Sequence, residues 1–137
     1  HIENRKAFVN KVFTTIRSGG YYCIADVESQ SRIAAFLDGF VGRYNGTGHE
    51  GMFLVSSLED NRHWLPNGTI VEHEVKSCPW RFSNERELTL FVRKLFALSN
   101  VTDQEILHTV ESEVGISGYA DGVQIEWELL YIVLQQP

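Results

Sequence analysis

The residues best suited to chemistry lie in the glycine-rich loop that runs from Asn45 to Gly51 and places His49 beside Glu50. Glycine lets a backbone approach a ligand closely, histidine exchanges protons near neutral pH, and a carboxylate can orient it. A small enzyme or ligand-binding domain would use His49 as base, with Glu72 or Glu74 as acid. Adjacent residues seldom point at one substrate atom, so a flexible connection with two solvated side chains is the alternative.

Metal ligands and cofactor-binding motifs are not apparent in the sequence. The histidines are dispersed and form no H-x-x-x-H pair, and the chain has no C-x-x-C pair. Gly19-Gly20 precedes a predicted strand rather than a helix, which argues against a phosphate loop. We therefore expect no metal and no cofactor. We also expect Cys23 and Cys78 to be reduced, because 137 residues can fold on a hydrophobic core without a disulfide.

Charge is distributed unevenly along the chain. The formal net charge is −6, yet residues 1–94 carry twelve basic and eleven acidic side chains. The remaining residues carry seven acidic side chains and no Lys or Arg. Such a field repels phosphate backbones and anionic lipids. The charge pattern disfavours nucleic-acid and membrane binding and favours a cationic partner, although an acidic surface also serves solubility alone.

Several of the carboxylates are expected to share the solvated face of a sheet. Glu72 and Glu74 alternate with apolar residues in one predicted strand, and Glu126 and Glu128 do so in another. A row of like charges on neighbouring strands is destabilising unless a cation arrives. The predicted acidic partner-binding face comprises Glu72, Glu74, Glu111, Glu113, Asp121, Glu126 and Glu128. Trp80 and Arg81 are candidate anchors, because Trp and Arg are enriched at interface hot spots.

The stretch from Val123 to Leu134 must position the last of these carboxylates. Its first half alternates apolar and polar residues, and after Glu128 both faces become apolar. The β-branched and aromatic content favours a strand over a helix. The pattern predicts a central strand that runs from a solvated surface into a layer covered on both sides.

The other elements follow from hydrophobic spacing and capping residues. Apolar residues at helical spacing predict helices over residues 5–17, 33–44 and 84–98, the last capped by Asn84 with Glu87. Strands are predicted at 21–27 and 52–56, and a hairpin joins 63–65 to 69–75. Residues 103–114 follow a capping box and favour a helix, but alternation there, with the turn dipeptide Asp121-Gly122, leaves a strand open.

The fold class that buries these apolar stripes is α+β. We expect a single compact domain over residues 1–137, with a four- to five-stranded mixed or antiparallel sheet and three main helices packed on one face. No run approaches 18 apolar residues, and the N-terminal segment lacks the apolar core of a signal peptide. A cytoplasmic protein is therefore expected.

These observations favour a non-enzymatic binding module. Its acidic face would dock a basic protein, and the most concrete form is an immunity protein or inhibitor that neutralises a cationic, nuclease-type bacterial toxin. The alternatives are the small enzyme or ligand-binding domain built on His49 and Glu50, and a homodimeric accessory domain.

Overall fold

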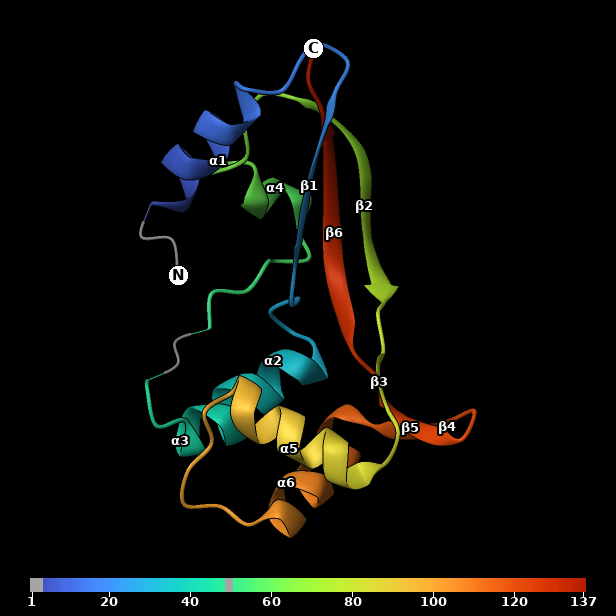
Figure 1. The fold of residues 1–137 in the computed structure, drawn as a ribbon. Coiled ribbons are helices and arrows are strands. Elements are labelled where there is room, and N and C mark those ends of the chain that lie inside the picture. The colour runs from blue at the N-terminus through green and yellow to red at the C-terminus, as the bar shows by residue number, and fades with distance from the viewer. Residues whose placement is uncertain (1–3, 49–50) are drawn as a thin grey trace.

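The computed structural model describes residues 4–48 and 51–137 and shows an α+β fold (Figure 1). The strands form two three-stranded antiparallel sheets, not the single larger sheet that the sequence predicted. The helices are correspondingly divided between the two sheets and do not cover one common face. His49 and Glu50 lie outside the described residues.

Sheet one has the strand order β1-β6-β2, with β6 in the centre. Its strands are β1 (Tyr21–Asp26), β6 (Glu128–Gln135) and β2 (Thr69–Ser77). Gln135 lies opposite Tyr21 on one side and Thr69 on the other. The central position predicted for the end of the chain is confirmed.

Sheet two has the strand order β3-β5-β4. Two of its strands are neighbours along the chain of two strands of sheet one. It consists of β3 (Trp80–Phe82), β5 (Gly122–Ile125) and β4 (Ile116–Tyr119). β2 leads into β3, and β5 leads into β6 across the break at Glu126 and Trp127. The predicted continuous strand is therefore two strands in different sheets. At the break the Cys78 amide donates to the Trp127 carbonyl at 2.8 Å, and the Glu126 amide donates to the Gly115 carbonyl at 3.0 Å.

Each sheet has its own group of helices. In Figure 1, α1 (Arg5–Phe13) and α4 (Leu58–Asn61) lie on one side of sheet one. The other helices lie around sheet two. They are α2 (Arg32–Phe36), which continues through the π-helical turn η1 (Leu37–Val41) into α3 (Gly42–Tyr44), α5 (Glu85–Leu95), and α6 (Asp103–Thr109), which continues into the π-helical turn η2 (Val110–Val114).

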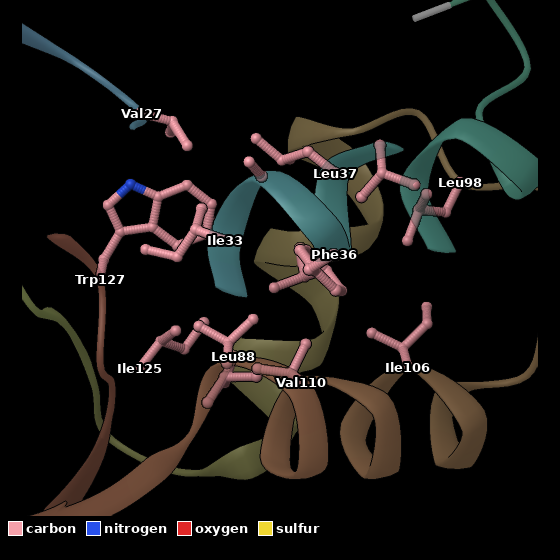
Figure 2. Packing of buried hydrophobic residues seen from close by; sticks show 14 residues of the cluster. Val27, Ile33, Phe36, Leu37, Leu88, Leu98, Ile106, Val110, Ile125 and Trp127 are labelled. Carbon is pink, nitrogen blue, oxygen red and sulfur yellow. The ribbon is translucent and has the colours of Figure 1, made fainter. Parts of the chain in front are cut away.

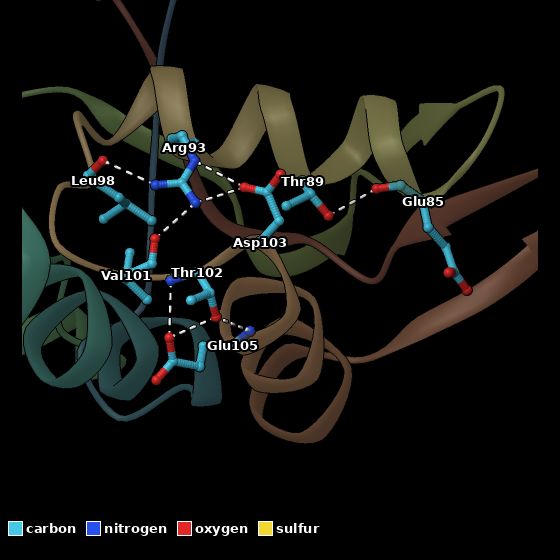
Figure 3. Close-up of polar contacts among 8 residues, drawn as sticks. All are labelled: Glu85, Thr89, Arg93, Leu98, Val101, Thr102, Asp103 and Glu105. Carbon is cyan, nitrogen blue, oxygen red and sulfur yellow. Dashed lines mark hydrogen bonds and ion pairs between the residues drawn. The ribbon is translucent and has the colours of Figure 1, made fainter.

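The predicted helix caps are present and decide the structure of residues 103–114. Asn84 accepts a hydrogen bond from the Glu87 amide at 3.0 Å, and Thr102 and Glu105 form a reciprocal capping box (Figure 3). This capping satisfies amides that a helix start leaves without partners, which favours the helix over the alternative strand. Arg93 then joins α5 to α6, because its Nη2 atom donates to Asp103 at 2.6 Å and to the Val101 carbonyl at 2.8 Å.

Three further predicted elements also differ in the structure. Residues 63–65 do not pair with β2, because Trp64 and Leu65 are buried among apolar side chains and β2 pairs with β6 instead. The strand predicted at 52–56 is reduced to one bridge between Leu54 and Glu28. The first helix ends at Phe13 rather than at residue 17, since the hydroxyls of the following threonines bond back to carbonyls of the last turn.

The hydrophobic core consists of two clusters. One fills the space between sheet two and its helices and contains Ile33, Phe36, Leu88, Ile106 and Trp127, among others (Figure 2). The other lies between α1 and sheet one and is built on Leu130, Ile132 and Leu134 with Val9, Phe13, Leu54, Trp64 and Leu65. We refer to them as the helical cluster and the sheet cluster.

Replacing Trp127 with alanine is expected to destabilise the protein by about 3–5 kcal/mol, the usual cost of removing a large buried aromatic side chain. Trp127 is 5% exposed and stacks on Trp80 at a centroid distance of 4.1 Å. Chemical denaturation measures the loss in the free energy of unfolding. Leu90→Ala is the control, because Leu90 is 47% exposed and its truncation is expected to change stability by about 0.5 kcal/mol or less. Equal losses in the two variants would contradict the assigned role of Trp127.

Candidate functional site

The side of sheet one opposite α1 is not covered by any helix of the described chain. Along β6, Leu130, Ile132 and Leu134 face the sheet cluster and are at most 2% exposed. The intervening residues face the other way and are half-buried. We call this second side the open face. The strand register places on it Tyr21, Cys23 and Ala25 from β1, Tyr131, Val133 and Gln135 from β6, and Glu72, Glu74 and Lys76 from β2. Leu129, at the start of β6, packs against the helical cluster instead.

The open face combines exposed aromatic and apolar groups with two carboxylates. Tyr21 is 62% exposed, and the Gln135 side-chain amide donates to its hydroxyl at 3.3 Å. Glu74 lies opposite Tyr131, and Glu72 lies opposite Val133 after a bulge in β2 between Ile70 and Glu72. Tyrosine and carboxylate groups of this kind serve in protein interfaces as anchors and as steering charges.

Lys76 holds the two carboxylates of this face. Its Nζ atom lies 2.5 Å from Glu72 and 3.2 Å from Glu74, and 5.5 Å from the centroid of the Tyr131 ring. The hydrogen bonds to Glu72 and then to Glu74 raise the pKa of Lys76 above its ordinary value. Two carboxylates and an aromatic ring thus form a surface site for an ammonium or guanidinium group, and the chain's own lysine occupies it.

The structure does not bring Glu126 and Glu128 to the open face, which corrects the prediction. Glu126 precedes β6 and accepts hydrogen bonds from the Ser117 hydroxyl and from the Gln124 amide, the latter at 3.1 Å. These bonds, that from Ser117 first, hold the pKa of Glu126 below its ordinary value, and the nearby Arg32 guanidinium acts in the same direction. Glu128 shares the opposite side of β6 with Leu130. The bend at Trp127 changes the alternation that the sequence suggested.

The remaining predicted carboxylates lie away from sheet one. Glu111 and Glu113 are exposed on η2, and Asp121 is exposed in the turn between β4 and β5. None of the three forms an ion pair with a residue in the described ranges. The seven predicted carboxylates therefore occupy several separate places, and only Glu72 and Glu74 lie on the open face.

The predicted anchors Trp80 and Arg81 do not lie on the open face either. Trp80 is half-buried between Trp127 and Phe91, which meets it edge-on at 5.3 Å. Arg81 is exposed, with its guanidinium carbon 3.9 Å from the centroid of the Tyr119 ring. Trp80 therefore belongs to the packing of sheet two, while Arg81 remains available at the surface of that sheet.

Sequence reasoning missed Tyr21, Lys76 and Tyr131 as members of the site. A signal for Lys76 was present, because residues two and four positions apart in a strand point to the same side, and Lys76 stands at these spacings from Glu74 and Glu72. Tyr21 and Tyr131 carried no such signal, since their common face depends on β1 pairing with β6 across more than a hundred residues.

Both cysteines have free thiols. Cys23 is exposed on the open face, and Cys78 is half-buried where β2 ends. Burial, followed by the charge of Glu128, raises the pKa of Cys78 and disfavours its reactive thiolate form.

Within residues 4–48 and 51–137, no three side chains of His, Cys, Asp or Glu come together as a possible metal site. No helix in these same ranges has the length and hydrophobicity needed to cross a membrane. Comparisons of the chain with protein-family models, curated proteins and solved structures gave no match, so a function has to be inferred from its own residues.

Ser117→Ala is expected to destabilise the protein at neutral pH and to have less effect in acid. A carboxyl group whose pKa is lowered by folding stabilises the fold above its unfolded-state pKa, and this contribution is lost as the pH falls through the folded-state pKa. For Glu126 the ordinary value is 4.5, so the loss occurs below that pH. The free energy of unfolding of both proteins, measured from pH 7 to about pH 3, checks this. A difference between them that stays constant over this range would contradict the role of the Ser117 hydroxyl.

Proposed function

We propose that the protein is a non-enzymatic binding module that docks a basic protein partner through the open face. Its most concrete form is an immunity protein or inhibitor that neutralises a cationic, nuclease-type bacterial toxin. The observation that carries the proposal is the arrangement of Glu72 and Glu74 around Lys76, beside Tyr131. The same face carries the exposed Tyr21 near the other end of the sheet.

The charge of the whole molecule supports a basic partner. The net charge of −6 attracts a cationic protein at long range, and the exposed Glu111, Glu113 and Asp121 contribute to this field from outside the open face. Long-range attraction of this kind raises the rate of association more than it lengthens the lifetime of the complex. The open face then supplies the short-range contacts.

The position of the Lys76 ammonium indicates that the partner must present a cationic side chain. A partner lysine or arginine would enter the space between Glu72 and Glu74 and displace Lys76 from at least one carboxylate. Exposed ion pairs of this type contribute little to stability, so the exchange costs little. Tyr131 would pack against apolar side chains around that cation, and Tyr21 would do so at the other end of the face. Tyrosines are well suited to such contacts because they are rigid and amphipathic.

An inhibitor of this design would act by covering the partner. A nuclease binds its substrate with a basic surface, because phosphate contacts dominate the affinity for nucleic acids. An acidic protein seated on that surface excludes the substrate without chemistry of its own. In the proposed role the protein acts in the cytoplasm, where it would protect the cell that makes both proteins.

Substitutions on the open face are expected to change the rate of association with the partner in opposite directions. Glu72→Gln with Glu74→Gln removes the two attracting charges and should slow association by about three- to tenfold at low salt. Lys76→Gln removes the competing cation and should accelerate association by a similar factor. The partner is first isolated by affinity purification from the source organism and mass spectrometry, and rates are then measured by surface plasmon resonance at low and high salt.

Glu111→Gln with Glu113→Gln is the matched control, because it removes the same charge from a site outside sheet one. This variant should show only the smaller change due to net charge. Equal rates for the two double variants would place the docking surface elsewhere. If the purified species is a second copy of this chain, the protein is a homodimer and the inhibitor proposal is wrong.

A further inference from the structure

A cavity of about 330 Å³ lies on the side of sheet one opposite the open face. It is bounded by α1, by β1, by residues 51–54 and by Trp64. Its volume lies within the usual range of small-molecule sites, near its lower end.

The walls of the cavity come from both hydrophobic clusters. Val9, Leu54 and Trp64 belong to the sheet cluster, whereas Leu37 belongs to the helical cluster and Phe53 packs against it. An apolar ligand would therefore contact both clusters at once. Phe8, which is 45% exposed, and Met52 stand at the opening.

Arg5 is the cationic group of this cavity. Its Nη2 atom donates to the Met52 carbonyl at 2.9 Å, and its guanidinium carbon lies 5.2 Å from the centroid of the Trp64 ring. These contacts fix the guanidinium against the wall. Among the residues that the structure describes, no acceptor bonds the Nε or Nη1 atom, and no carboxylate pairs with the guanidinium. A guanidinium presents pairs of parallel N–H groups that match the two oxygens of a carboxylate.

Asp26 lines the same cavity and limits the charge of the ligand. Its Oδ1 atom accepts the Val27 amide hydrogen bond at 2.8 Å, and it forms no ion pair with Arg5. A second anionic group on the ligand would be repelled by this carboxylate. The chemistry of the walls thus favours one negative charge on a largely apolar body.

We infer that this cavity binds an apolar monocarboxylate, with the carboxylate on Arg5 and the apolar body between Trp64 and the residues that join the two hydrophobic clusters. The site faces away from the open face, because Tyr22, Ile24 and Asp26 alternate along β1 with Tyr21, Cys23 and Ala25. The inference is independent of the proposed partner. A bound ligand stabilises the folded protein by mass action.

The test uses the full chain and 3-phenylpropionate as the probe, compared with its uncharged analogue 3-phenylpropionamide. Titrations followed by ¹H–¹⁵N NMR give the affinities and locate the site, and thermal unfolding gives the stabilisation. The acid should bind saturably and at least tenfold more tightly than the amide. The shifts should centre on α1, on Tyr22–Asp26 and on residues 51–54, and the acid should raise the melting temperature.

Arg5→Gln should abolish the preference for the acid, and Arg5→Lys should retain part of it. Arg62→Gln is the matched control, because it removes one exposed positive charge from a residue that does not line the cavity, and it should leave the preference intact. If Arg5→Gln fails to fold, Phe8→Asp at the exposed opening tests the inference in its place. It should weaken binding of the acid about tenfold more than binding of the amide, because the added carboxylate repels only the charged probe, whereas both probes lose the Phe8 ring.

Three binding results would overturn the inference. They are the absence of saturable binding of the acid at millimolar concentration, equal binding of acid and amide, and a preference for the acid that survives Arg5→Gln. Shifts centred on Lys76 and the open face would also overturn it, because they would report attraction to a surface lysine.

Discussion

The burial of Trp127 is the interaction on which the rest of the structure depends. Its indole stacks on Trp80 and Phe96 inside the helical cluster, while β6, which starts one residue later, forms the centre of sheet one. A straight strand could not place Trp127 in the helical cluster and also run through the centre of sheet one, so the chain bends at Trp127. The segment that pairs with it, from β2 to β3, bends at the same place. The same two chain segments, β2 with β3 and β5 with β6, consequently border both hydrophobic clusters. The bend also decides which side of sheet one each residue of β6 faces.

Local signals in the sequence predicted several elements well. Asn84 and Thr102 act as the expected N-caps, and the apolar stripe around Leu88 and Val92 is buried as a helix predicts. Capping and helical periodicity are decided within a few residues, so they can be read without knowledge of the fold. The division into two sheets could not be predicted from local signals, because it depends on Trp127 packing among helices that are distant in the sequence.

The candidate site was predicted only in part for the same reason. Alternation correctly placed Glu72 and Glu74 on one side of a strand, but which strand lies beside it is a long-range property. Glu126 shows most clearly where the prediction was wrong. The alternating pattern placed it on the solvated side of a strand, but it lies at the bend and accepts hydrogen bonds from Ser117 and Gln124. The two sides of β1 and β6 then acquire different chemistry, with apolar groups and a cavity on one side and tyrosines and carboxylates on the other.

The position of β6 also has a consequence for how the protein is made. β1 and β2 both pair with β6 and not with each other, and Tyr21 meets Gln135, which is synthesised 114 residues later. During translation both strands therefore leave the ribosome without a partner, with their backbone edges and apolar sides accessible. Unpaired edges of this kind are prone to association with other chains, so a nascent chain that stalls before β6 should need chaperones or be degraded.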